Sequence, residues 1–289
     1  KEKIFDNIWV QPAAGDAGGS LGAALALWHI DQNNSRKVDH NDSMQGSYLG
    51  PEYSQKEIEE HLDKAGAKYE IFKDEELLDK TATDLSKEQA IGWFQGRMEF
   101  GPRALGGRSI LGDPRSEKMQ KNLNLKVKYR ESFRPFAPSI LKEDLSEWFD
   151  INVDSPYMLM VSNINKDKII EMTDEQKKLF GIDKLNIKRS EIPAVTHVDY
   201  SARIQTVHKE TNERYFRLIE KFKEKTNCPI LVNTSFNVRG EPIVNTPLDA
   251  FNCFMGTDLD KMVIGNCFLD KKDQNSSLKK DYTQEFELD

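Results

Sequence analysis

Three arginines, Arg97, Arg103 and Arg108, lie in the glycine-rich stretch GRMEFGPRALGGRSIL at residues 96–111. Glycine permits backbone angles that are closed to other residues and lets main-chain N–H groups approach a ligand closely. An arginine guanidinium matches phosphate oxygens two at a time. Together these residue types predict a pocket for a polyanion.

The positive charge is concentrated locally. Between residues 96 and 134, ten Lys and Arg residues stand against four Asp and Glu, a balance of +6 in a chain of net charge -7. The alternative is a solvated surface on which the arginines pair with nearby acids, as most charge runs do. Because these arginines alternate with Gly, Pro and Phe rather than with Glu, we favour the anion pocket.

A second polar segment is NTSFN, at residues 233–237, directly after the β-branched run PILV. Asn233, Ser235 and Asn237 alternate, so on an extended chain they share one face and can offer amide and hydroxyl groups to a single ligand. Strand ends also carry Asn and Ser for conformational reasons alone. The two explanations are equally good for this segment.

A third segment, THVDYSARIQTV at 196–207, contains His197, Asp199, Ser201 and Arg203. A histidine here can be an acid–base group or a hydrogen-bonded core residue. We interpret His197 as a core residue.

Strands and helices must position these segments. Helical spacing predicts helices at 54–66, behind a Ser54 cap, at 115–130, at 212–227 and at 247–257. The helix expected at 212–227 carries Tyr215, Leu218, Ile219 and Phe222 on one face. Apolar runs predict extended segments at 90–96, 133–141, 157–164, 229–243 and 261–270. The first thirty residues predict a strand, a glycine loop and an Ala/Leu helix. The polar passage 31–53 is typical of a linker, and the residues after about 274 are expected to form a disordered tail.

Composition narrows the class of protein. The chain has 289 residues, 38% of them hydrophobic, and a sequence pI of about 5.5. The acidic balance argues against general attraction to nucleic acid or anionic membranes. Cys228, Cys253 and Cys267 form no Cys-x-x-Cys pair and are expected to be buried, reduced thiols. Since no apolar run reaches the roughly 20 residues of a membrane span and no signal peptide is evident, we expect a soluble cytoplasmic protein.

The motifs carry a family resemblance. GRMEFGPRALGGRSIL, KVKYRESFRPFAPSIL, HVDYSARIQTV and NTSFNVRGEPIV resemble the carboxy-terminal half of the NodU/CmcH carbamoyltransferases, which carbamoylate nodulation factors, cephalosporins and aminoglycosides such as tobramycin. The resemblance extends from QPAAGDAGGSLGAA to GNCFL, nearly the whole chain. It implies an α/β fold: a YrdC-like domain with a twisted mixed sheet and helices at 49–272, preceded at 1–48 by a linker and a remnant of an actin-like (ASKHA) ATPase domain. A polar tail follows at 273–289.

The resemblance also implies a reaction. The YrdC-like domain of the family makes carbamoyl-adenylate from ATP and carbamoyl phosphate with Mg²⁺, releasing phosphate and pyrophosphate, and the ATPase-like domain transfers the carbamoyl group to a hydroxyl of a small-molecule acceptor. Matching the motifs residue by residue assigns the catalytic contacts to Lys128, Arg134 and Arg103. Ligand binding is assigned to Arg203, Ser235, Asn237 and Asn233, with Arg97, Arg108 and Arg130 as further candidates.

The amino-terminal GDAGGSLGA resembles the late phosphate and metal loop of the ATPase-like domain. Asp16 matches a metal-ligand aspartate, and Gly18 and Gly19 match residues near the nucleotide phosphates; a glycine turn that begins a helix is the alternative. The family's other iron ligands are two histidines four residues apart, and this sequence has no His-x-x-x-His. The chain is therefore expected to be a fragment or one half of a split protein, with iron bound only together with the missing domain.

Two other functions remain open from the sequence. A YrdC-like module could bind RNA through its basic surface, although the net charge of -7 counts against it. It could also bind a nucleotide or a sugar without turnover.

Overall fold

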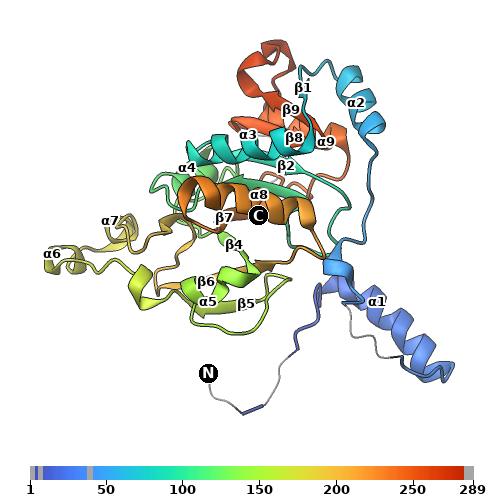
Figure 1. Ribbon diagram of the computed structural model, residues 1–289, viewed down its shortest axis with the longest axis horizontal. Coiled ribbons are helices and arrows are strands. Elements are labelled where there is room, and N and C mark those ends of the chain that lie inside the picture. The colour runs from blue at the N-terminus through green and yellow to red at the C-terminus, as the bar shows by residue number, and fades with distance from the viewer. Residues whose placement is uncertain (1–3, 6–8, 38–41, 283–289) are drawn as a thin grey trace.

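The computed structural model describes residues 4–5, 9–37 and 42–282. Within these residues a single mixed sheet of nine strands runs in the order β1-β9-β8-β2-β3-β7-β4-β6-β5 (Figure 1). Strand β2 is parallel to β8 and β4 is parallel to β6, whereas the other neighbours are antiparallel. The strands are β1 Glu70–Ile71, β2 Ile91–Phe94, β3 Arg108–Gly112, β4 Ala137–Leu141, β5 Met160–Asn163, β6 Ser201–Val207, β7 Ile230–Ser235, β8 Lys261–Ile264 and β9 Cys267–Asp270.

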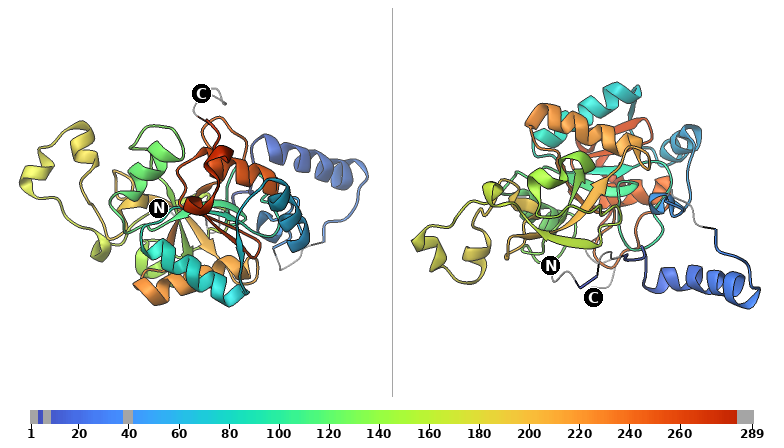
Figure 2. Two further views of the ribbon diagram at one scale, coloured as in Figure 1. Left: turned by 90° about the horizontal axis from the view of Figure 1, so that it is seen from above. Right: turned by 60° about the horizontal axis from the view of Figure 1, so that its bottom comes forward.

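Helices cover both faces of this sheet. Helices α3 and α8 lie side by side on one face, and α4 and α9 lie on the other (Figure 2). The helices are α1 Asp16–Ala26, α2 Gln55–Lys64, α3 Asp74–Ser86, α4 Met119–Lys126, α5 Leu145–Trp148, α6 Asp174–Lys177, α7 Gly181–Leu185, α8 Glu213–Thr226 and α9 Pro247–Gly256. An α/β sheet with helices is therefore confirmed.

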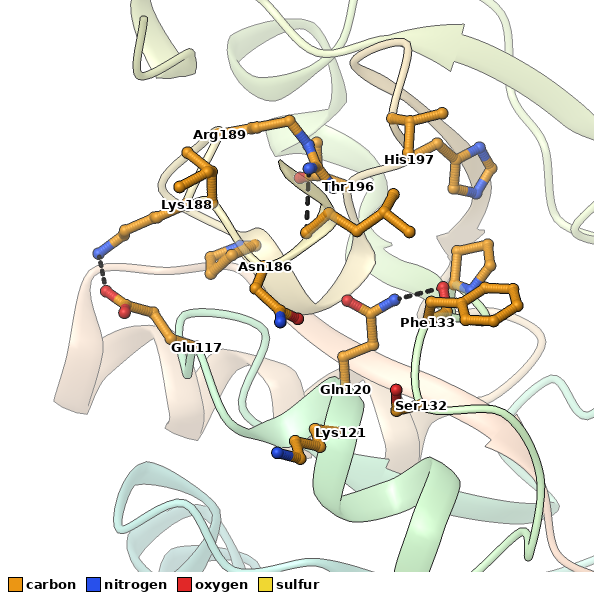
Figure 3. A pocket seen from close by; sticks show the side chains of 15 residues that line it. Glu117, Gln120, Lys121, Ser132, Phe133, Asn186, Lys188, Arg189, Thr196 and His197 are labelled. Carbon is orange, nitrogen blue, oxygen red and sulfur yellow. Dashed lines mark hydrogen bonds and ion pairs between the residues drawn. The ribbon is translucent and has the colours of Figure 1, made fainter. Parts of the chain in front are cut away.

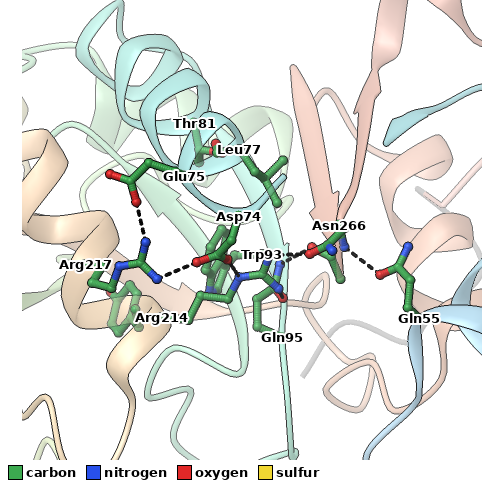
Figure 4. A network of polar contacts seen from close by, with 12 residues as sticks. Gln55, Asp74, Glu75, Leu77, Thr81, Trp93, Gln95, Arg214, Arg217 and Asn266 are labelled. Atoms are coloured by element: carbon green, nitrogen blue, oxygen red, sulfur yellow. Dashed lines mark hydrogen bonds and ion pairs between the residues drawn. The ribbon is translucent and has the colours of Figure 1, made fainter. Parts of the chain in front are cut away.

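Polar contacts fix α3 and α8 to the sheet (Figure 4). Arg214 of α8 forms an ion pair with Asp74 at 2.8 Å and donates to Gln95 Oε1 and Asn266 Oδ1, both at 2.6 Å. Arg217, one turn later, also pairs with Asp74. Because Gln95 follows β2 and Asn266 lies in the β8–β9 turn, one arginine ties two strands to both helices.

Local sequence explains the elements that were predicted correctly. Ser54 begins α2 with a capping box in which its side chain and that of Glu57 each bond the other's backbone N–H. In α8 the side chain of Asn212 caps the first turn, and Asn227 ends the helix in the left-handed conformation. The apolar face predicted for this helix is buried.

Several sequence predictions were wrong. The stretch 261–270 is a hairpin rather than one strand, because Gly265 at φ +53 and Asn266 form a tight turn. The helix expected at 115–130 is confined to α4, and Tyr129 beyond it has φ +48. The region 96–111, taken as a loop, ends in the fully buried strand β3.

The chain ends also differ from expectation. Tyr282 is buried, and its ring lies against Gly256, so the disorder expected after residue 274 is not found up to this point; residues 283–289 lie outside the described part. At the amino end, residues 9 and 10 are not in a strand, and residues 6–8 are outside the described part. The passage 31–53, expected to be a linker, contains a packed 3₁₀ turn, Gln45–Ser47. Its residues 38–41 also lie outside the described part.

Helix α1 extends away from the sheet (Figures 1 and 2). None of its residues is buried, and Leu25, together with Leu27 and Trp28 of the π-helical turn Leu27–Asp31 that follows, exposes about half of its surface. The segment before it is nonetheless anchored, since Trp9 packs edge-on against Tyr157.

The three cysteines are free and buried, as predicted. Burial raises the pKa of the Cys228 thiol to about 12 and that of Cys267 to about 11, so both are unreactive thiols at neutral pH. In the described ranges, no helix has the length and apolar character that a membrane crossing needs.

Candidate functional site

A cavity of about 170 Å³ brings together five of the predicted site residues, Arg103, Arg130, Arg203, Asn233 and Ser235. We call it the arginine cavity. It lies where β6, the end of β7, the loop before β3 and the entry to β4 meet, and its lining contains no Asp or Glu. The lining residues are Pro102, Arg103, Ala104, Arg130, Pro135, Phe136, Ala137, Met158, Arg203, Asn233, Thr234 and Ser235.

Arg103 and Arg203 form its unneutralised charge. Neither has an ion pair within the described residues, and the Nε of each is buried without a hydrogen-bond partner. Burial, followed by the proximity of Arg103, lowers the pKa of Arg203. A guanidinium group stays protonated even so. Two half-buried like charges with free donors are stabilised by an anion between them.

Arg130 is the third arginine of the lining. Its Nε donates to Asn124 Oδ1 at 2.7 Å, and its guanidinium lies 4.9 Å from the centre of the Phe136 ring. Burial, followed by repulsion from Arg134, lowers its pKa to about 10. Arg130 therefore lies in the cavity with a fixed orientation.

Lys128 lies next to this cavity but is not in its lining. The side chain is 4% exposed, and Nζ donates to Asn237 Oδ1 at 2.7 Å, Asn237 O at 2.8 Å and Ser235 Oγ at 3.3 Å, and also to Ser235 O. Ser235 Oγ donates to Asn237 Oδ1 at 2.7 Å. The sequence analysis grouped Lys128 with Arg134 and paired Ser235 with Asn237. In the structure Lys128 instead bonds Ser235 and Asn237 and holds the turn after β7.

Arg108 has a different environment. It is fully buried, its guanidinium lies 3.5 Å from the centre of the Phe94 ring, and burial lowers its pKa to about 10. Its nitrogens donate to the main-chain carbonyls of Gln95, Gly96, Gly107 and Pro51. All these acceptors belong to the protein, so Arg108 supports the loop and does not reach the cavity.

Glu99 completes that support. Its carboxylate is buried and accepts from the backbone N–H groups of Leu105 at 2.6 Å, Gly107 at 2.7 Å and Arg108 at 3.2 Å. In the sequence, Glu99 is only one of four acids between residues 96 and 134. An acid inside a glycine-rich turn was the available signal, since it can accept several main-chain N–H groups.

Arg97 and Arg134 are surface residues. Arg97 is 55% exposed and lies 3.6 Å from Glu52, and Arg134 is 50% exposed and lies 4.0 Å from Glu131. Neither belongs to the lining of the arginine cavity. His197 is half-buried, bonds Ser201 Oγ at 3.0 Å, and has its pKa lowered mainly by burial.

The amino-terminal candidates lie in or beside α1. Gly18 and Gly19 are helical, so the expected glycine loop begins the helix instead. A Cβ on Gly18 would meet the carbonyl oxygen of Ala13 at 2.2 Å, which explains that glycine by packing. Asp16 is exposed, and the described residues contain no group of three or more His, Cys, Asp or Glu able to hold a metal. The described residues by themselves therefore do not form the iron site that the resemblance implies.

A polar network under the arginine cavity was missed by the sequence analysis. Gln205 of β6 and Ser139 of β4 are both buried and both bond Asn233 of β7. Ser139 Oγ donates to Gln205 Oε1 at 2.6 Å. No signal in the sequence joins residues so far apart, because only the neighbouring positions of β4, β6 and β7 bring them together.

A second cavity, of about 220 Å³, shares Pro135 with the first (Figure 3). We call it the side cavity. It lies between α4 and the segment 185–198. Gln120 donates to Phe133 O at 3.0 Å, and the Phe133 side chain is 49% exposed.

Comparison with known proteins decides the family. The family model described as "Carbamoyltransferase C-terminus" matches residues 82–271. The chain belongs to this carbamoyltransferase family. The match confirms the resemblance that the motifs predicted.

The family's relatives are longer than this chain. It is 55% identical over 292 residues to "Uncharacterized protein sll1178" of Synechocystis sp., a match covering 100% of this chain and 48% of that protein. It is 40% identical over 273 residues to "Nodulation protein NolNO" of Sinorhizobium fredii, covering 93% of this chain and 37% of that one. The chain thus spans about half the length, or less, of these relatives.

Among solved structures, full-length HypF in the phosphate- and nucleotide-bound form matches with a TM-score of 0.42 and 14% sequence identity. The match covers 66% of this chain and 25% of that one.

Proposed function

We propose that the arginine cavity binds phosphate groups during formation of carbamoyl-adenylate, the activated intermediate of carbamoyl transfer, on a YrdC-like domain. The observation that carries this proposal is the set Arg103, Arg130 and Arg203 around one cavity without a carboxylate. Family membership supports the carbamoyl chemistry. Mg²⁺ would enter with ATP, because this lining offers no carboxylate ligand and Mg²⁺ is often held by substrate phosphates.

Formation of carbamoyl-adenylate takes two steps. Carbamoyl phosphate and water give carbamate and phosphate; a carbamate oxygen then bonds to the α-phosphorus of ATP as the bond to pyrophosphate breaks. Negative charge grows on the departing pyrophosphate, and fixed arginines stabilise that charge without covalent chemistry. Lys128 would act by holding Ser235 and Asn237 at the edge of the cavity.

The side cavity is the proposed place for the adenosine part of ATP. It adjoins the arginine cavity at Pro135, and the half-exposed ring of Phe133 offers a stacking surface. Replacing Phe133 by Ala is expected to weaken ATP binding about 2- to 10-fold and to leave phosphate binding unchanged. Calorimetric titrations with ATP and with inorganic phosphate separate these outcomes.

The remainder of the reaction is proposed for the longer protein. Helix α1 with its exposed apolar side chains would pack against the portion of the longer relatives that lies outside the match, as expected if residues 1–48 belong to the ATPase-like domain. That portion would bind iron and the hydroxyl of a small-molecule acceptor.

The test follows pyrophosphate released by the chain from ATP, carbamoyl phosphate and Mg²⁺, beside the Arg203→Ala variant. We expect release by the wild type and its loss in the variant. Calorimetric binding without pyrophosphate would favour a nucleotide-binding module without turnover. Absence of both binding and release would overturn the proposal, and RNA binding with a steep salt dependence would revive the nucleic-acid alternative.

A further inference from the structure

Asn233, which lines the arginine cavity, has an unused hydrogen-bond acceptor. Its side chain is 1% exposed, lines the cavity, and has an Oδ1 that is buried without a hydrogen-bond partner in the described part of the chain. Buried polar atoms nearly always form hydrogen bonds, so an unpaired acceptor in a residue that lines a cavity indicates a hydrogen bond from a ligand. The three arginines around it can only donate.

The orientation of this amide is forced by its neighbours. The carbonyl of Leu105 accepts from Gln205 Nε2 at 2.8 Å, so the Oε1 of Gln205 must face the other way. That Oε1 accepts from Asn233 Nδ2 at 2.9 Å, and the carbonyl of Ala104 accepts from the same nitrogen at 3.1 Å. A carbonyl cannot donate, so Asn233 must present its NH₂ to them, which leaves Oδ1 unpaired.

This arrangement suits a ligand that both accepts and donates. A phosphate oxygen accepts from the arginines, but a phosphate dianion has no donor for Asn233. Carbamoyl phosphate and carbamate carry an NH₂ group, which does. An acetyl group has the same shape as a carbamoyl group, with a methyl in place of the amine.

We propose that Asn233 Oδ1 accepts a hydrogen bond from the carbamoyl NH₂ and thereby selects carbamoyl over acyl phosphates. The inference rests on the proposed function and names the residue that determines its specificity. Gln205 is the positioning residue, because it fixes which face of the Asn233 amide the cavity meets. A methyl group against Oδ1 leaves that acceptor unpaired, which is expected to cost about 5- to 150-fold in affinity.

The first test uses the wild-type chain and two stable analogues, phosphonoacetamide and acetonylphosphonate, which differ only in NH₂ against CH₃. Calorimetric titration is expected to give phosphonoacetamide at least about fivefold tighter binding. Equal affinities would overturn the inference while leaving the anion site intact. If neither analogue nor inorganic phosphate binds at millimolar concentration, the proposed function itself falls, and the inference with it.

The second test is Asn233→Ala, with folding checked by circular dichroism. Its affinity for phosphonoacetamide should fall to that for acetonylphosphonate, which stays within about twofold of its wild-type value. Asn165→Ala is the matched control, since that amide donates to Ser146 O on the exposed surface, away from the cavity. A preference for phosphonoacetamide that survives in a folded Asn233→Ala variant contradicts the role. The wild-type titration decides the question even if this variant does not fold.

Discussion

Arg103 and Arg108 come from one glycine-rich segment yet meet opposite environments. Arg108 is fully buried and bonded to main-chain carbonyls, with the Glu99 carboxylate nearby. Arg103, in contrast, lies beside Arg203, and its guanidinium group has no hydrogen-bond or ion-pair partner in the described residues. A guanidinium group bonded to main-chain carbonyls stabilises the fold, whereas one without such partners is available to a ligand. Substitutions in the arginine cavity should therefore change anion affinity, whereas substitutions of Arg108 or Glu99 should change stability.

The largest effect is expected from Arg108→Ala. The substitution leaves four main-chain carbonyls and the Glu99 carboxylate without their cation, so the free energy of unfolding should fall by about 3–5 kcal/mol. Urea denaturation followed by tryptophan fluorescence measures it. A loss below about 1 kcal/mol would contradict the supporting role.

Arg203→Ala is expected to have the reverse profile. Affinity for pyrophosphate should fall about 10- to 150-fold, because hydrogen bonds to a charged ligand are lost. Stability should hold or rise slightly, since the repulsion from Arg103 is removed. Titration calorimetry and urea denaturation give the two readouts, with Lys177→Ala on the exposed α6 as a control. A large loss of stability with unchanged affinity for pyrophosphate would show that Arg203 has a structural role like that of Arg108.

Lys128 tests an intermediate case, a buried cation bonded only to neutral oxygens. Burial lowers its pKa to about 7, so between about pH 7 and its ordinary value near 10.4 the unfolded chain binds more protons than the folded one. Stability therefore rises with pH across this window. Relative to Lys128→Met, the wild-type free energy of unfolding should increase by up to about 1.4 kcal/mol per pH unit from pH 7 to 9. A constant difference would place the pKa of Lys128 outside that range.

The smallest effect is expected from Arg97→Ala. This side chain is 55% exposed and its contact with Glu52 is 3.6 Å long, so stability should change by less than about 0.5 kcal/mol. Pyrophosphate affinity should also stay within about twofold. A loss of pyrophosphate affinity comparable to that of Arg203→Ala would show that the anion site includes the exposed surface of the loop.

Much of the fold was accessible from local sequence. The Ser54 cap and the apolar face of α8 are patterns within one or two turns, and both were predicted. The strand β3 was not, because RSILG places an arginine in a buried position that pattern rules reserve for apolar residues. Likewise, Gly265 and Asn266 form a tight turn that divides an apolar run into a hairpin, whereas the apolar run predicted a single strand.

The sequence by itself determined the family, through motifs in a fixed order, and the surplus of arginine in one acidic chain. It could not decide which arginines face a ligand. That depended on the neighbouring positions of β4, β6 and β7 in the sheet, which place Arg203 and Asn233 in one cavity, and on Glu99, which folds the loop so that Arg108 points inward. The physical reason is that a charge is free or neutralised according to its spatial neighbours, and those neighbours come from distant parts of the chain.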